Sequence, residues 1–490
     1  MLATKTTQSD WLSLDRHQPI GSRALFDHSP HSFNLDRQFS AARLTQSDAL
    51  LANEKLTTFS VNTQQIVGTF RADTFTVSSA IARTIISGNG NTDFGSGRRD
   101  LLDLSSTSSS SVRFNWANQA GVAYNPGTGT RIFDAIDFND GRQILFEGIE
   151  SIQFADRVVN LAIVPNDPLF SQQWNLHMIG VQNAWRFTTG SPNVLIGVED
   201  TGLSLDRSNA PHLDLGSTRA LAGQFADDGR ENHGTAVQGI IAAATDNGIG
   251  MSGINWKSTV IHVDILGRNW GDLSLAEGSQ QIINQARQTG HRLVINLSLG
   301  IPKSFGVNYS TGLEEIVKNN PDVVFVIAAG NDGHLRIEGI ASPANLARLY
   351  NNVIAVGAVW GTQNRFGQTT TPGTRIEYPS WWGSQYGEGL TLMAPSEVIA
   401  PTSRDTFGDS VRFTYQSDFN GTSAATPQVT GIASLLLSVN PVLSAAQVRQ
   451  ILVQTATDVA QPGFDKFTGA GVVNADAAVR RAIALWRGFA

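Results

Sequence analysis

The sequence predicts an α/β fold: a doubly wound, mostly parallel sheet with helices on both faces, preceded by a smaller, mainly β region. From about residue 166 onward, short β-branched runs alternate with helical stretches, which is typical of a parallel sheet. The chain of 490 residues is 41% hydrophobic and 16% charged, so it can bury a large core. Before residue 165 this alternation is missing. We therefore expect two domains, residues 1–165 and 166–490.

Five apolar runs are the predicted strands of the second domain, and three stretches are its clearest helices. The strands are NVLIGVED (193–200), STVIHVDIL (258–266), RLVINLSLG (292–300), VVFVIAAGN (323–331) and NVIAVGAV (352–359). The helices are expected at 274–290, which ends on a glycine, and at 444–459 and 474–486, which begin on a capping Ser or Asn.

The first domain is predicted to consist of short strands and turns. Its segments GTFRADTF (68–75) and GSGRRDLLDLS (95–105) resemble worn copies of the calcium-binding nonapeptide of secreted β-roll proteins. Arg98 and Arg99 depart from that repeat, which has small or neutral residues at their places. The two prolines of VPNDPLFSQQW (164–174) suit a linker between the domains.

Composition excludes several classes of function. The net charge of −7 and the lack of a Lys- or Arg-rich patch argue against nucleic acid as a partner. The chain has no cysteine, which excludes disulfides, thiolate zinc sites and cysteine nucleophiles, and it has no HExxH pair of histidines. No apolar run is long enough to span a bilayer. Asp10, Asp15 and Arg16 stand where a secretory signal has its apolar core, so we expect a cytoplasmic protein or export without a cleaved signal peptide.

The stretch FNGTSAATPQVTG (419–431) carries the first candidate for chemistry. It sets Ser423 after a Gly-Thr turn, at the start of a small-residue run that predicts a buried helix. Ser423 is either a helix cap, which accepts backbone N–H bonds, or a nucleophile held on a sharp turn. The second interpretation requires a base that takes the hydroxyl proton and a third group that orients the base.

Three residues at strand ends and helix starts are candidate partners of this serine. Asp200 closes the strand at 193–200, His233 precedes a helix of small and apolar residues, and Asn331 ends the strand at 323–331. Each has an ordinary alternative, as a turn former, a helix start or part of a tight turn. The amide of Asn331 could instead donate a hydrogen bond to a developing oxyanion.

Four sequence blocks containing these residues, VEDTG, NHGTAVQGIIAA, AAGND and NGTSAATPQVTG, closely resemble the active-site blocks of the subtilisin-like serine proteases. The triad of that family also runs in the order Asp, His, Ser. The resemblance implies that Ser423 is the nucleophile, His233 its base and Asp200 the group that orients the base. It further implies an oxyanion hole made by Asn331 and the Ser423 N–H. Pro427 matches the family pattern and is expected within the first helical turn, where a missing N–H is no loss.

The resemblance, which covers about residues 168–485, also implies a cleft for an extended peptide. The residues implied to line it are Ser298, Leu299 and Gly300 on one wall and Ala328, Ala329 and Gly330 on the other. Small apolar walls predict large uncharged side chains before the scissile bond. Asp332 at the rim either attracts a polar or basic side chain or is a solvated turn residue.

The loop TDNGIGMSGI (245–254) resembles the calcium loop of the same family. This implies a structural calcium ion held by the side chain of Asn247 and the backbone carbonyls of Ile249 and Met251. The aspartate ligand of the family has no clear match, and Asp214 is a candidate. No cofactor is expected for the chemistry itself.

The predicted function is hydrolysis of peptide bonds of proteins by a serine endopeptidase, through an acyl-enzyme intermediate. The alternative is a catalytically silent or autoinhibited protein that keeps the protease fold as a binding scaffold. A silent protein usually loses a catalytic residue, whereas this sequence keeps all four. Residues 1–165 could nevertheless cover the cleft as a pro-segment.

Overall fold

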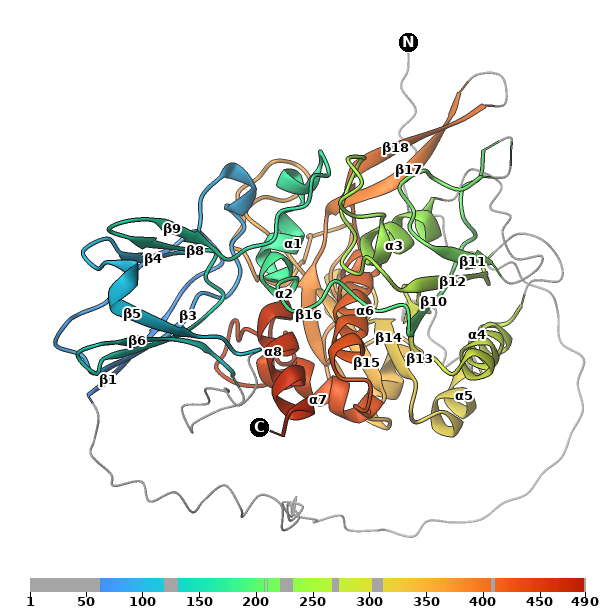
Figure 1. Cartoon of the computed structure of the whole chain (residues 1–490). Helices are drawn as coiled ribbons and strands as arrows, with labels where there is room; N and C mark the ends of the chain where they lie inside the picture. The colour runs from blue at the N-terminus through green and yellow to red at the C-terminus, as the bar shows by residue number, and fades with distance from the viewer. Residues whose placement is uncertain are drawn as a thin grey trace, which may run out of the picture. The chain divides into compact units, whose positions relative to one another are not determined.

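The computed structural model describes residues 62–118, 131–206, 208, 210–220, 232–266, 273–301, 312–406 and 410–488. All of them belong to one compact unit, Val61–Ala490, which holds a β-rich region followed by a larger α/β region (Figure 1).

A seven-stranded, wholly parallel sheet is the centre of the α/β region (Figure 1). Its strand order is β11-β12-β10-β13-β14-β15-β16, and each neighbouring pair runs parallel. The strands are β10 (Val194–Asp200), β11 (Thr218–Ala220), β12 (Thr259–Asp264), β13 (Arg292–Leu297), β14 (Val324–Ala328), β15 (Val353–Val359) and β16 (Leu392–Pro395). Five of them coincide with the five predicted runs, so the predicted fold class is confirmed.

Helices cover both faces of this sheet (Figure 1). They are α1 (Trp174–Met178), α2 (Val181–Ala184), α3 (His233–Ala242), α4 (Leu275–Thr289), α5 (Leu313–Asn319), α6 (Thr422–Val439), α7 (Ala445–Thr455) and α8 (Ala475–Trp486). Side chains alternate along β10, so its two faces meet different helices. Gly197 leaves room for Ile282 of α4 on one face, while Ile196 and Val198 share an apolar cluster with Ala236 of α3 on the other.

A hairpin that the sequence did not suggest leads into α6. Its strands, β17 (Val398–Thr406) and β18 (Ser410–Phe419), pair antiparallel and extend away from the sheet (Figure 1). Because β18 ends only three residues before α6 begins, the hairpin fixes where that helix starts.

The β-rich region is a roll of two sheets with an apolar core between them. One sheet has the order β1-β3-β7-β6-β5 and the other β2-β4-β8-β9. The chain passes from the first sheet to the second three times. The strands at these passages pair in parallel, as β1-β3-β7 and β2-β4-β8, whereas β5, β6 and β9 join the sheets antiparallel. The strands are β1 (Thr63–Val67), β2 (Thr74–Thr76), β3 (Arg83–Ser87), β4 (Leu101–Leu104), β5 (Val112–Asn115), β6 (Asp134–Phe138), β7 (Gln143–Glu147), β8 (Ser151–Phe154) and β9 (Val158–Asn160).

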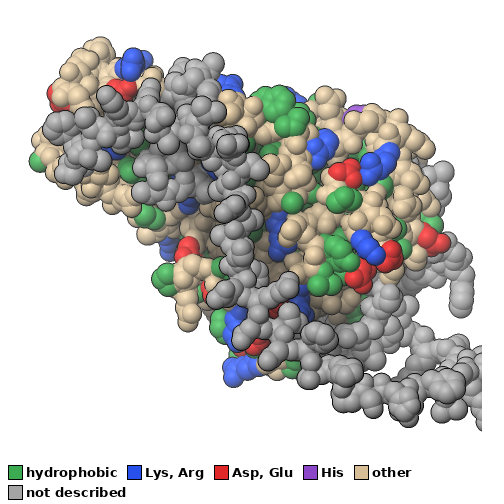
Figure 2. Space-filling model, turned by 90° about the horizontal axis from the view of Figure 1, so that it is seen from below, with side chains coloured by type: hydrophobic (Ala, Val, Ile, Leu, Met, Phe, Trp, Pro, Cys, Tyr) green, Lys and Arg blue, Asp and Glu red, His purple; other side chains and the backbone are tan. Residues whose placement is uncertain are grey.

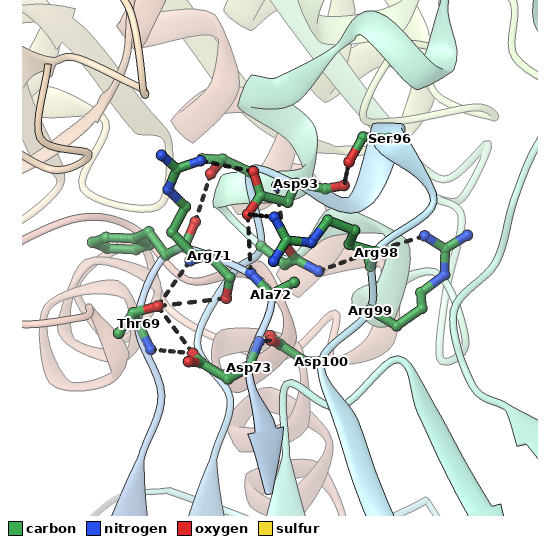
Figure 3. Close-up of polar contacts among 12 residues, drawn as sticks. Thr69, Arg71, Ala72, Asp73, Asp93, Ser96, Arg98, Arg99 and Asp100 are labelled. Carbon is green, nitrogen blue, oxygen red and sulfur yellow. Dashed lines mark hydrogen bonds and ion pairs between the residues drawn. The ribbon is translucent and has the colours of Figure 1, made fainter. Parts of the chain in front are cut away.

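The two segments that resemble calcium-binding repeats lie at the first two of these passages, where arginines face carboxylates (Figure 3). Nη1 of Arg71 is 2.8 Å from Oδ1 of Asp93, and Nη1 of Arg98 is 3.7 Å from Oδ2 of the same carboxylate. The backbone N–H of Asp73 donates to Oδ1 of Asp100 at 2.8 Å. One ion pair and one hydrogen bond thus join the neighbouring turns. A cavity of about 440 Å³ lies beside them, lined by Arg98 and other residues of the roll, and none of the sequence-predicted site residues lines it.

Buried contacts join the roll to the α/β region. The segment predicted as a linker, 164–174, alternates exposed with buried residues, and its Phe170, only 3% exposed, anchors it in the core. Arg480 of α8 reaches Asp134 of the roll at 2.9 Å and Asp476 of its own helix at 3.0 Å. All three of these charged side chains are at most 1% exposed, so the network is shielded from solvent.

Lys, Arg, Asp and Glu side chains are interspersed on the face of the molecule drawn in Figure 2, without a field of one sign. Within the part of the chain that the structure describes, no helix combines the length and the hydropathy needed to cross a membrane.

Candidate active site

Asp200 and His233 form a short hydrogen bond at the carboxyl end of the sheet. Asp200 is the last residue of β10 and is fully buried, and His233 is the first residue of α3. Nδ1 of His233 lies 2.6 Å from Oδ1 of Asp200. Because a carboxylate only accepts, Nδ1 carries the proton, and the lone pair of the neutral ring is on Nε2. The ring packs edge-to-face on Phe419, with the centroids 5.2 Å apart.

Thr201 ties the two residues together from behind. Its N–H donates to the same Oδ1 of Asp200 at 2.8 Å, and its Oγ1 accepts from the N–H of Gly234 at 2.9 Å. A Cβ on Gly234 would lie 2.1 Å from the carbonyl oxygen of Thr201. Only a residue without a side chain therefore lets α3 start this close to the end of β10.

Ser423 is the second residue of α6, as the sequence predicted for a serine at a helix start. Gly421, with φ at 84°, makes the sharp entry into the helix, a conformation that favours glycine. The hydroxyl of Ser423 donates to the carbonyl oxygen of Ser298 at 2.9 Å. The next residue, Ala424, shares an apolar cluster with Ala236 of α3, so the starts of α6 and α3 lie close together.

The expectation for Pro427 was wrong. Since α6 begins at Thr422, Pro427 lies beyond the first turn, and its missing N–H would leave the carbonyl of Ser423 without its intrahelical donor. The hydroxyl of Ser298 donates to that carbonyl at 3.1 Å instead. Ser298 therefore both accepts from Ser423 and compensates for the proline.

Asn331 is held at the same helix start, three residues after β14 ends. Its Oδ1 accepts from the N–H and the hydroxyl of Thr422, at 2.9 and 3.0 Å. A backbone N–H can only donate, so the oxygen of the amide must face the helix, and the Nδ2 donor faces elsewhere. A Cβ on Gly421 would lie 3.1 Å from this Nδ2, which places the donor beside the turn that carries Ser423.

Residues predicted for the two walls of the cleft lie close together after the ends of β13 and β14. A Cβ on Gly300 would lie 3.8 Å from the carbonyl oxygen of Ala328. It would also lie 3.2 Å from Cβ of Ala341, a residue that the sequence did not suggest. Ala329 bonds to Ala341 through its carbonyl, and Gly330 donates to Oγ1 of Thr422 at 3.1 Å. Leu299 packs partly buried against the main core.

The predicted calcium loop wraps around Asp214. Oδ2 of Asp214 accepts from the N–H of Met251 at 2.8 Å, and its Oδ1 is buried without a hydrogen-bond partner among the described residues. Oδ1 of Asn247 accepts from the N–H of Ile249. Asp167, which the sequence analysis missed, accepts from the N–H of Asn247 at 3.0 Å. Burial, and secondarily Asp167, raises the pKa of Asp214 to about 7. Among the described residues, no group of three or more His, Asp or Glu is arranged as a metal cluster.

Glu199 lies next to Asp200 but points to the opposite face of the sheet. It is fully buried and accepts a hydrogen bond from the hydroxyl of Ser279 in α4. Burial raises its pKa from 4.5 to about 8. At pH values between 4.5 and 8, the folded protein therefore keeps a proton on Glu199 that the unfolded chain has lost. The protonated Glu199 stabilises the fold at low pH, and this stabilisation is lost as the pH rises through the folded-state pKa of about 8.

We expect Glu199→Gln to remove this pH dependence. The free energy of unfolding of the wild type should fall relative to the variant by up to about 1.4 kcal/mol per pH unit between pH 5 and 8. Urea unfolding at several pH values measures it. Glu388→Gln, at a side chain that is 76% exposed, is the control and should follow the wild type. Parallel curves for Glu199→Gln and wild type would contradict the prediction.

Sequence reasoning named the candidate catalytic groups of this site but not the residues that contact and hold them. Thr201 and Thr422 were inside the recognised blocks, where their hydroxyls were a usable signal. Ala341 and Asp167 stand outside the blocks, and no local pattern distinguishes them. Asp332, with two open interpretations, bridges to Gly383 through its backbone.

The chain is similar to known proteases over much of its length. The model of the subtilase family matches residues 191–471, which include the four candidate catalytic residues. An extracellular protease of Xanthomonas campestris pv. campestris is 31% identical over 382 residues, which cover 68% of this chain and 60% of that protein. Subtilisin DY of Bacillus licheniformis is 34% identical over 297 residues, 59% of this chain and 91% of that protein. A solved protease from Pseudoalteromonas arctica aligns with 65% of this chain and 100% of its own, at 26% identity and a TM-score of 0.47. The chain belongs to the subtilase family of serine proteases.

Proposed function

We propose that this chain is an endopeptidase that hydrolyses peptide bonds of proteins through an acyl-enzyme, with Ser423 as the nucleophile. The observation that carries the proposal is the 2.6 Å hydrogen bond from Nδ1 of His233 to the buried carboxylate of Asp200. It fixes the tautomer in which Nε2 can accept a proton. A catalytically inactive scaffold would not require the buried Asp200 carboxylate to bond to the His233 ring, which is 34% exposed.

The reaction begins when the Ser423 hydroxyl leaves the Ser298 carbonyl, by rotation about Cα–Cβ, and donates to Nε2 of His233. Oγ then bonds to the carbonyl carbon of the scissile peptide, whose π electrons move to the oxygen, while His233 takes the proton. Asp200 stabilises the resulting imidazolium. His233 returns the proton to the leaving amine as the C–N bond breaks. Water repeats the same steps on the acyl-enzyme and releases Ser423.

The developing oxyanion needs donors in place before the reaction. Nδ2 of Asn331 and the N–H of Ser423 are the proposed pair. The Ser423 N–H belongs to the first turn of α6, where backbone donors lack intrahelical acceptors. Thr422 fixes the Asn331 amide through two hydrogen bonds, so its donor does not have to reorient during the reaction.

The substrate is proposed to bind as an extended strand along Ser298, Leu299 and Gly300. Its side chain before the scissile bond would enter between Gly300 and the wall of Ala328 to Gly330. Ala341 supports the prediction of uncharged side chains, because its methyl group lies beneath Gly300 and offers no charge to a basic group.

Labelling with a fluorophosphonate probe tests this function, because the probe phosphonylates only serines that a base activates. We expect one probe per folded chain, located on Ser423 by peptide mass mapping. Folded protein that takes up no probe would overturn the proposal and favour the silent scaffold.

We further propose that the β-rich roll is a permanent part of the enzyme rather than an inhibitory pro-segment. Gly90 and Gly95 approach α1 and the segment before it so closely that a Cβ would lie 1.8 Å from the Met178 carbonyl oxygen and 1.7 Å from that of Ser171. Phe94 between them belongs to the main core. These contacts lie around α1, α2 and α8, whereas the candidate site lies at the starts of α3 and α6. The mass of the probe-labelled protein tests it: a labelled species without residues 62–163 would contradict the proposal.

A structural calcium ion is proposed at the loop around Asp214. The unpartnered Oδ1 of Asp214, the carboxylate of Asp167 and the oxygen of Asn247 are hard donors of the kind that calcium prefers, and Ile249 and Met251 would add backbone carbonyls. The ion would hold the loop, and it would take no part in the chemistry.

Calcium at a hundred times its Kd should therefore raise the free energy of unfolding by about 2.7 kcal/mol over the chelated protein. Differential scanning fluorimetry with calcium or EGTA measures the effect as a shift in Tm. The variant Asp214→Asn should lose most of the shift. An equal shift in the wild type and the variant would place the calcium elsewhere.

A further inference from the structure

His262 lies fully buried in the middle of β12, behind the candidate catalytic pair. Its Nε2 is 2.7 Å from the carbonyl oxygen of Thr201, and its Nδ1 is 3.0 Å from the amide oxygen Oε1 of Gln238 in α3. A carbonyl oxygen only accepts, so Nε2 must carry a proton and donate to Thr201. No sequence pattern indicated this contact, because a lone histidine in an apolar strand has many ordinary explanations.

Burial keeps this ring neutral. Desolvation lowers the pKa of His262, while the Thr201 carbonyl and the charge of Asp200 oppose that effect only in part. A neutral ring with its proton on Nε2 makes one directed hydrogen bond to Thr201. Nδ1 of this neutral ring has no proton and can only accept. In the structure it faces Oε1 of Gln238, whose Nε2 donates to the hydroxyl of Thr218, so Nδ1 bonds to Gln238 only when that amide is rotated by 180°.

Thr201 connects His262 to both members of the candidate catalytic pair. Its N–H donates to the oxygen of Asp200 that also accepts from His233, and its hydroxyl accepts from the N–H of Gly234, which follows His233. The carbonyl of the same residue is the acceptor for His262. Thr201 is thus fixed through its N–H, its hydroxyl and its carbonyl.

The atoms around this contact are closely packed. A Cβ on Gly234 would lie 2.1 Å from the Thr201 carbonyl oxygen and 3.0 Å from Cε1 of His262. The start of α3 therefore rests directly on the Thr201 carbonyl and the edge of the imidazole. A shift of Thr201 would move the carboxylate of Asp200 and the ring of His233 together.

We propose that His262 is a positioning residue of the reaction: through its hydrogen bond to the Thr201 carbonyl, it holds Asp200 and His233 in the geometry that makes His233 a base. This inference rests on the proposed function. His262 itself touches neither the substrate nor the reacting atoms.

Two substitutions separate the contacts of the ring. His262→Gln places an amide nitrogen where Nε2 lies and can still donate to Thr201. His262→Asn places one where Nδ1 lies and loses the Thr201 contact while keeping the one to Gln238. The measurements, on the full chain, are kcat and KM per probe-labelled active site, the pH dependence of kcat/KM, and Tm.

For His262→Asn we expect kcat to fall roughly tenfold or more with KM unchanged, since small misplacements of catalytic groups have effects of this size. The acid limb of the pH profile should also move to lower pH, because a misplaced Asp200 stabilises the imidazolium of His233 less. His262→Gln should restore most of kcat and the wild-type pH profile.

Equal kcat values and pH profiles for the Asn and Gln variants, with only Tm lowered, would reduce His262 to a structural role and overturn the inference while leaving the proposed function intact. A folded wild type that neither hydrolyses peptides nor takes up the probe would overturn both. Because kcat is counted per labelled site, loss of folded protein cannot imitate the expected result.

Discussion

Ser423→Ala is expected to abolish fluorophosphonate labelling and to lower kcat roughly a million-fold. Without the hydroxyl, His233 has no nucleophile to activate, and only the oxyanion donors and substrate binding remain. The fold should survive, because the Ser423 hydroxyl donates only to the Ser298 carbonyl, and the residue that compensates for Pro427 is Ser298 rather than Ser423. Hydrolysis of a fluorogenic peptide, compared with wild type at equal folded protein, measures the effect.

Ser438→Ala is the matched control. It is the same substitution in the same helix, at a half-buried serine whose hydroxyl bonds to the carbonyl of Ser434, far along α6 from the site. It should keep full labelling and activity. If Ser423→Ala retained a substantial part of the wild-type kcat, the nucleophile would be another group. If both variants lost activity alike, damage to α6 would explain the result.

The second large effect is expected on stability. Arg480→Ala removes a guanidinium that is 1% exposed and lies between the carboxylates of Asp134 and Asp476. Two buried carboxylates would then lack their shared partner, and Arg186, at 3.1 Å from Asp134, compensates only one of them. Breaking one side of a buried ionic network typically costs about 3–5 kcal/mol. Urea unfolding should show a loss of this size.

Arg487→Ala, at an exposed residue just after α8, is the control and should change stability by less than about 0.5 kcal/mol. Limited proteolysis adds a second readout. Since the network joins the roll to α8, Arg480→Ala should make the segment 164–174 easier to cut. Equal stabilities for the two arginine variants would show that the network does not hold the roll in place.

Local pattern was enough to locate most elements of the α/β region. The strands of a parallel sheet are buried on both faces, so β10, β13, β14 and β15 appear in the sequence as continuous apolar runs. Capping residues also indicated correctly where two helices begin. Ser444 accepts from the N–H of Gln447 and Asn474 from that of Ala477, as expected for residues that begin α7 and α8.

Elements whose identity depends on distant partners could not be predicted in this way. The hairpin of β17 and β18 carries no strong turn signal that local reasoning recognised. The roll was expected only as short strands and turns, because each of its strands is three to five residues long and is stabilised by the next passage of the chain. Whether 62–163 is a removable segment or a permanent part likewise depends on contacts such as Gly90 with Met178, which no sequence pattern encodes.

The sequence by itself determined which residues are the candidates for the chemistry: an Asp, a His, an Asn and a Ser, each in a block whose pattern ends a strand or begins a helix. Only the tertiary structure decided how these groups are held. In it, Thr201 donates to Asp200 and Thr422 donates to Asn331. Ser298 replaces the N–H that Pro427 lacks, and His262 donates to the carbonyl of Thr201. The physical reason is that a reactive side chain can be recognised in the sequence by its residue type and by its position at the end of a strand or the start of a helix. A supporting hydrogen bond arises between residues that are distant in sequence, and it exists only once the sheet brings their strands side by side.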